Sequence, residues 1–283
     1  MKILCVGDIN LDIITPPIKY FPLREEQLIV RDFKWFLGGS TAITAAALSS
    51  LGVETTMVGA VGEDMLGNLL IKKLEKWGVK SLIKKTTAPT EVTFAVTFEN
   101  SSRSFITTAG ANKNLKISDV PDLEGYDHLH LSSYYHLKGM QSSIRTLFSR
   151  AKKKEMTISF DPGFVAGASP VQVKKLLPLT DILFLNEAEL QKFGGSQYCS
   201  RRVPVLAIHA GAKGGIVYTK GKKYTYSTPS SVRPVNLTGA GDVYNAMFIK
   251  CFLEKRPVEE CLKKAVKASS FYIKQKEQRF PVR

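Results

Sequence analysis

The chain has 283 residues, of which 44% are apolar, and this share is sufficient for a folded core in one large domain. Its formal net charge is +15, from 40 basic and 25 acidic residues, which favours anionic partners. The basic residues are dispersed and lack interleaved aromatic side chains, so we expect no nucleic-acid partner. No apolar run is long enough for a membrane helix or shaped like a signal peptide, and the four cysteines form no C-x-x-C pair, so we expect reduced thiols in a cytoplasmic protein.

Strands and helices are predicted to alternate along most of the chain. The first half has strands at 2–6 and 55–61 and helices at 40–50 and 67–77. Further strands are predicted at 128–132, 156–160, 181–185, 204–208, 215–219 and 223–227, and further helices at 140–153, 170–177, 187–193, 240–254 and 257–274. This order predicts an α/β fold with a central, mostly parallel sheet covered by helices on both faces.

Two segments interrupt the alternation. Residues 13–36 and 90–107 show apolar residues at every second position, and Asn100 to Ser102 is a turn signal within the second segment. We therefore expect a small β lid inserted into a single domain that spans residues 1–283. The exposed face of such a lid could also pair with that of a second subunit, so a homodimer stays open.

Polar residues and glycines follow several of the predicted strands. They lie at 7–12, 161–163, 186–189 and 209–215. Ligands of parallel α/β sheets bind at the carboxyl ends of the strands. These segments are therefore expected to surround one cleft.

The stretch Val235 to Phe248, VNLTGAGDVYNAMF, carries the chemistry most directly. Its backbone amides at Gly239, Ala240 and Gly241 would open a helix and form an anion site. Asp242 follows them and could act as a general base beside a transferred phosphoryl group. The alternative is that Asp242 only complements the helix dipole.

Five motifs in order along the chain point to a known family. They are Gly38-Gly39, Gly59 with residues 62–67, Gly110-Ala111-Asn112, Asn186 with Glu189, and Leu237 to Asp242. Together they resemble the ribokinase-like (PfkB-type) carbohydrate kinase family over essentially the whole chain. The resemblance implies a ribokinase-like α/β fold with a β lid. It also implies transfer of the γ-phosphate of ATP to a hydroxyl of a small sugar or nucleoside, with Mg²⁺ as cofactor.

The resemblance also implies roles for single residues. Asp242 matches the catalytic base, and the matching anion hole is formed by Gly239, Ala240 and Gly241. Asn186 and Glu189 match the pair that orders Mg²⁺ through water. The remaining matches fall into a nucleotide-binding set (Gly211, Lys213, Gly214 and Thr238) and a substrate-binding set (Asn10, Asp12, Gly38 and Gly39), to which Arg103 of the lid is added.

Plainer interpretations of some of these residues stay open. Asp12 could be a turn residue, Asn186 the N-cap of a helix, and Lys213 a solvated loop residue. Gly38-Gly39 could serve only as a tight turn, and Arg103 could face water.

Departures from the family pattern limit what the resemblance implies. Asn236 stands where many members have an Asp that serves a monovalent-cation site, so such a cation is doubtful. Ile43 and Ser132 replace an Asn and a Glu that bind sugar in the ribokinase branch, so free ribose is a poor candidate. The acceptor stays unnamed. A non-catalytic regulator of the same fold that binds a sugar or nucleotide is the competing hypothesis.

Overall fold

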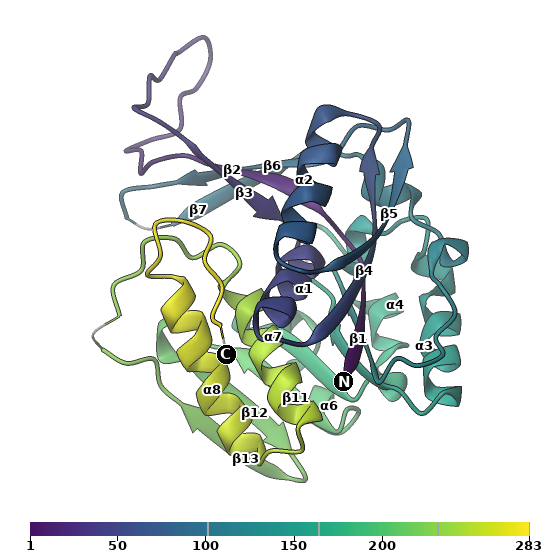
Figure 1. Cartoon of the computed structure of the whole chain (residues 1–283). Coiled ribbons are helices and arrows are strands. Elements are labelled where there is room, and N and C mark those ends of the chain that lie inside the picture. Colours follow the sequence, from purple (N-terminus) through teal and green to yellow (C-terminus); the bar gives the residue numbers. More distant parts are fainter. Residues whose placement is uncertain (101, 164, 231, 283) are drawn as a thin grey trace.

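The computed structural model describes residues 1–100, 102–163, 165–230 and 232–282. Within these described residues, the main sheet has nine strands in the order β13-β12-β11-β10-β9-β8-β1-β4-β5 (Figure 1). The strands are β1 Lys2–Val6, β4 Glu54–Gly62, β5 Lys80–Thr86, β8 His128–Ser132, β9 Thr157–Asp161, β10 Ile182–Asn186, β11 Val205–His209, β12 Gly215–Thr219 and β13 Lys222–Tyr226. All neighbours pair in parallel except β11 with β12 and β12 with β13. The α/β prediction is thus confirmed.

Each face of the main sheet packs against its own helices. Along β1, Ile3 and Cys5 belong to one apolar cluster, whereas Leu4 and Val6 belong to the other, as alternating strand side chains require. The first cluster includes residues of α1 Ser40–Ser50, α2 Met65–Lys76, α7 Ala240–Leu253 and α8 Val258–Tyr272. The second includes residues of α3 Ile144–Lys153, α4 Val171–Lys174, α5 Glu187–Lys192 and α6 Gly195–Ser200.

A four-stranded lid lies to one side of the main sheet (Figure 1). Its order is β3-β2-β6-β7, with β2 Asn10–Ile14, β3 Lys34–Gly38, β6 Val92–Thr97 and β7 Arg103–Thr107. Strand β2 begins at Asn10 and β3 ends at Gly38, so the lid reaches beyond the expected range of 13–36 at both ends. Asn10 and Asp12 therefore lie on a lid strand rather than in the loop after β1.

Several elements differ from the prediction. Strand β5 was not expected, because KSLIKKT carries three lysines. It is an edge strand of the main sheet, where charged side chains reach water. The helix expected at 170–177 is shorter, since α4 ends at Lys174 and a 3₁₀ turn containing Pro178 follows. Helix α6 was also missed. The four cysteines are free and buried, as predicted.

In the part of the chain that the structure describes, no helix has the length and apolar character needed to cross a membrane.

Candidate active site

The first turn of α7 lies at the centre of the candidate site. Gly239 caps it with φ of +84°, and a Cβ at this position would approach Tyr272 Oη to 2.9 Å. Glycine is therefore required both by the backbone conformation and by the space. The first-turn amides of Gly241 and Asp242 have no intrahelical acceptor, and no described side chain caps this helix end. The turn thus presents donors and the positive end of the helix dipole to an anion.

Asp242 lies beside these amides and is half-buried. Its Oδ1 accepts a hydrogen bond from Ser40 Oγ, the first residue of α1. Burial raises the pKa of Asp242 well above its usual range, the Ser40 hydrogen bond lowers it, and the nearby Asp161, Asp8 and Asp12 raise it further. A carboxylate with a raised pKa is a stronger proton acceptor, as a general base requires.

Asp12 and Asn10 extend from β2 towards Asp242 across a small cavity. Asn10 Nδ2 donates to Asp12 Oδ1 at 2.6 Å and to Thr93 Oγ1 at 3.0 Å. Burial raises the pKa of Asp12 to about 7. Since Asp12 lies within a strand, the interpretation as a turn residue is wrong. The cavity measures about 240 Å³, and its lining includes Asp8, Asn10, Asp12, Gly39, Ser40, Ile43, Thr93, Thr238, Gly239 and Asp242.

Gly38 and Gly39 do more than form a tight turn, because a side chain at either position would clash with groups around the smaller cavity. A Cβ on Gly38 would fall 2.1 Å from Asp12 Oδ1 and 2.7 Å from Asn10 Nδ2. Gly39 has φ of +90°, and a Cβ there would lie 2.7 Å from the carbonyl oxygen of Asp8. Both glycines therefore make room for the polar groups of the smaller cavity.

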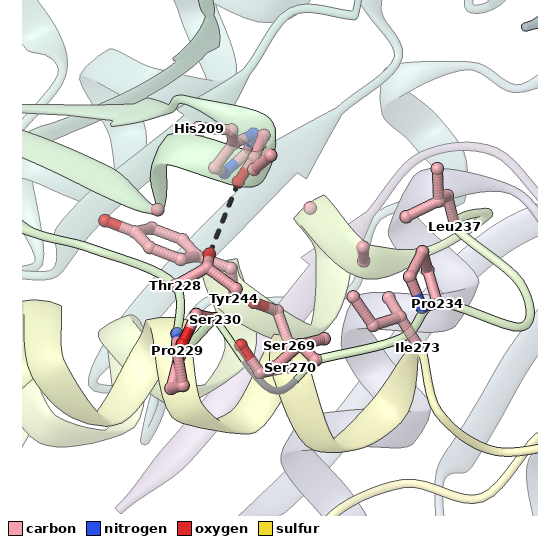
Figure 2. A pocket seen from close by; sticks show the side chains of 16 residues that line it. His209, Thr228, Pro229, Ser230, Pro234, Leu237, Tyr244, Ser269, Ser270 and Ile273 are labelled. Atoms are coloured by element: carbon pink, nitrogen blue, oxygen red, sulfur yellow. Dashed lines mark hydrogen bonds between the residues drawn. The ribbon is translucent and has the colours of Figure 1, made fainter. Parts of the chain in front are cut away.

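A larger cavity of about 370 Å³ lies on the other side of the first turn of α7 (Figure 2). Pro234, Leu237 and Ile273 form an apolar wall, and Ser269 and Ser270 enter it from α8. Gly211 and Gly214 also line this cavity, and Thr228 Oγ1 donates to the Gly211 carbonyl at 3.4 Å. The size and the apolar wall suit a flat, drug-sized ligand such as a nucleotide base and ribose.

Two residues expected at the nucleotide, Lys213 and Thr238, do not line the larger cavity. Lys213 does not line the larger cavity; it is exposed and its Nζ pairs with Glu187 Oε1 at 3.3 Å. Thr238 lines the smaller cavity instead. Its amide donates to Asn236 Oδ1 at 2.9 Å, so the residue that replaces the family's Asp holds the loop before α7.

Asn186 and Glu189 form a reciprocal cap on α5. The Glu189 amide donates to Asn186 Oδ1 at 2.8 Å, and the Asn186 amide donates to Glu189 Oε2 at 2.8 Å. The N-cap interpretation is therefore correct as a description of the contacts. Asn186 pairs with His209, which lines the larger cavity. The described residues contain no cluster of three or more His, Cys, Asp or Glu side chains that could hold a metal ion. The oxygen-bearing side chains of Asn186 and Glu189 nevertheless suit an ion such as Mg²⁺, which is held mainly by phosphates and water.

Arg103 connects the lid to the loop before α7. Its Nη1 donates to Thr238 Oγ1 at 2.8 Å, although the two residues are 135 positions apart in the sequence. The side chain therefore contacts a residue that lines the smaller cavity, Thr238, although Arg103 itself does not line that cavity.

Several residues of the site were missed by the sequence reasoning. Asp8 accepts the amides of Ser40 and Thr41 at 3.2 and 3.0 Å and thereby caps α1. Beneath Asp242, Asn245 Nδ2 donates to Asp161 Oδ2 at 2.7 Å, and Asn245 Oδ1 lies 2.8 Å from His209 Nε2. Burial raises the pKa of Asp161 and lowers that of His209. The sequence pointed to Asp161 and His209 only through their positions after predicted strands, and it gave no signal for Asn245.

The fold and the two adjoining cavities define the class of protein. The model of the pfkB family carbohydrate kinases matches residues 1–283, so the chain belongs to this family. It is a phosphotransferase that binds ATP and phosphorylates an alcohol group of a carbohydrate or nucleoside.

Individual relatives are distant in sequence but match this chain over most of their length. The ATP-dependent ribose-1-phosphate kinase of Halopiger xanaduensis is 27% identical over 276 residues, covering 94% of this chain and 89% of the relative. The crystal structure of the Methanocaldococcus jannaschii nucleoside kinase has a TM-score of 0.84 at 23% identity, covering 99% of this chain and 95% of the other. The adenosine kinase of Sinorhizobium meliloti has a TM-score of 0.88 at 22% identity, covering 99% and 96%.

Proposed function

We propose that the protein transfers the γ-phosphate of ATP to a hydroxyl of a small sugar or nucleoside across the first turn of α7, with Asp242 as general base. One observation carries this proposal. Ala240 and Gly241 line the larger cavity, whereas Gly239 and Asp242 line the smaller one. A single helical turn therefore faces both reactants. ATP occupies the larger cavity and the acceptor the smaller.

The transfer follows from the groups on this turn. The acceptor hydroxyl gives its proton to the Asp242 carboxylate while its oxygen forms a bond to the γ-phosphorus and the bond to ADP breaks. The amides of the first turn hold the transferred phosphoryl oxygens, and glycine at 239 and 241 lets them approach closely. Asn186 and Glu189 would hold the waters of Mg²⁺, which would neutralise phosphate charge when bound.

The acceptor is held on the lid side. Asp12 can accept hydrogen bonds from two neighbouring hydroxyls, and Asn10 fixes its orientation. Relatives bear the names of kinases for ribose 1-phosphate and for nucleosides, so both kinds of acceptor belong in a substrate screen. We propose that residues 1–283 form one catalytic domain. Pairing of two lids in a homodimer remains a prediction, and sedimentation analysis would test it.

The test is turnover by the Asp242→Asn variant. Asparagine keeps the shape and can still accept the Ser40 hydrogen bond, but it cannot take up the proton. We expect kcat to fall ~10²–10⁴-fold with an unchanged affinity for ATP. Asp32→Asn on the exposed loop between β2 and β3 is the matched control.

Wild-type turnover by Asp242→Asn would refute the role of the base. A protein that binds sugars and ATP but releases no ADP with any acceptor would instead support the non-catalytic regulator.

A further inference from the structure

A third cavity adjoins the smaller one beneath the lid. It measures about 580 Å³ and shares Phe105, Thr107 and His136 with the proposed acceptor cavity. The third cavity and the acceptor cavity are therefore neighbouring parts of one larger cavity. A ligand whose hydroxyl lies at Asp242 can extend past His136 into the third cavity.

The third cavity is lined by cations. Lys113 follows the Gly110-Ala111-Asn112 motif, and Lys138 lies just beyond β8. Both side chains are exposed, and neither forms an ion pair with a carboxylate of the described residues. Their charges are therefore available to a ligand.

Glu91 is the acidic residue that lines this cavity, and its carboxylate is already engaged. It is 4% exposed and accepts hydrogen bonds from the Gly110 amide at 3.1 Å and Asn112 Nδ2 at 2.9 Å. His136 Nδ1 lies 3.4 Å from Glu91 Oε2, and this hydrogen bond raises the pKa of His136. Glu91 thus accepts the hydrogen bonds of the buried Gly110 and Asn112 donors and fixes His136 at the border of the two cavities.

The acceptor cavity has the opposite charge. Asp8, Asp12 and Asp242 line it, so an anionic group at that end would be repelled. A hydroxyl-bearing ligand with an anionic group at its far end matches both parts. Resting on the function proposed above, we propose that the acceptor is an anionic sugar derivative, whose phosphate or carboxylate is bound by Lys113, Lys138 and His136.

Matched acceptors test this inference. Wild-type protein is assayed for ADP release with Mg-ATP and a neutral sugar, its phosphate ester and its sugar acid, for example ribose, ribose 1-phosphate and ribonate. We expect kcat/KM to be at least tenfold higher for one of the anionic forms. The two anionic arms distinguish phosphate from carboxylate recognition.

Variants locate the effect. We expect Lys113→Ala/Lys138→Ala to raise the KM of the anionic acceptor roughly tenfold or more, with little change in kcat or in the KM of ATP. Lys80→Ala/Lys116→Ala removes the same charge from exposed positions outside the cavity and should leave all constants unchanged.

The outcomes separate the two proposals. Equal kcat/KM for neutral and anionic acceptors, or equal effects of the two double variants, would overturn the anionic subsite while leaving the kinase function intact. Absence of ADP release with every acceptor would overturn the function instead. In that case the subsite is tested by thermal stabilisation with ribose 1-phosphate or ribonate in the absence of ATP. Stabilisation of the wild-type protein that is lost in Lys113→Ala/Lys138→Ala would support the subsite. No stabilisation of the wild-type protein would reject it.

Discussion

Asp12→Asn should make the protein more stable at neutral pH. In the folded chain Asp12 is buried among polar groups, with its Oδ1 bonded to Asn10 and the charge of Asp8 nearby. Asparagine at this position keeps an oxygen for the Asn10 hydrogen bond but carries no charge. The substitution therefore removes the unfavourable burial of a carboxylate and its repulsion by Asp8.

The magnitude and its pH dependence follow from the pKa. Burial moves the pKa of Asp12 from 3.8 to about 7. Folding therefore takes up a proton between these pH values, and wild-type stability falls as pH rises through this window. At ~1.4 kcal/mol for each pH unit, the full penalty above pH 7 is ~4 kcal/mol. The advantage of Asp12→Asn should be absent near pH 4, grow up to pH 7, and stay constant above it.

Urea unfolding of both proteins between pH 5 and 8 measures this difference, with Asp32→Asn as an exposed control. We expect the same variant to bind the acceptor more weakly, because a carboxylate that is costly to bury is retained for recognition. A variant less stable than wild type at pH 8, or an advantage independent of pH, would refute the reasoning.

Two further substitutions probe the turn and the lid. Gly239→Ala and Gly221→Ala both place a side chain at positive φ, which should cost ~1 kcal/mol of unfolding free energy in each, and Gly239→Ala should cost more because its Cβ also crowds Tyr272 Oη. Only Gly239→Ala should lower kcat. Equal kcat in both would contradict the anion hole. Arg103→Ala removes the bond to Thr238 and should raise the acceptor KM ~10-fold, whereas Arg31→Ala on the exposed lid loop should not. An unchanged KM would mean that this bond is only structural.

The alternating part of the fold could be predicted from the sequence because its signals are local. Apolar strands such as β1 and β10 are buried on both faces and therefore read as continuous apolar runs. Strand β5 could not be recognised in the same way, since its place at the sheet edge permits lysines that a central strand would exclude.

The site was predictable where the backbone itself needs glycine. Gly39 and Gly239 have positive φ, and such positions leave a visible mark in the sequence. Ser40 and Asn245 leave none, because their roles come from pairs far apart in the chain. Ser40 bonds Asp242 across 202 positions, and Asn245 bonds Asp161 across 84. Only the assembled fold brings these groups together.

The close approach of Gly38 to Asp12 also limits how this chain can evolve. Any side chain at 38 would occupy the space of the Asp12 carboxylate, because the Cβ alone would lie 2.1 Å from its Oδ1. The two positions therefore cannot drift independently. A lineage that replaced Gly38 would first have to replace Asp12, and a return to Asp12 would first require glycine at 38 again.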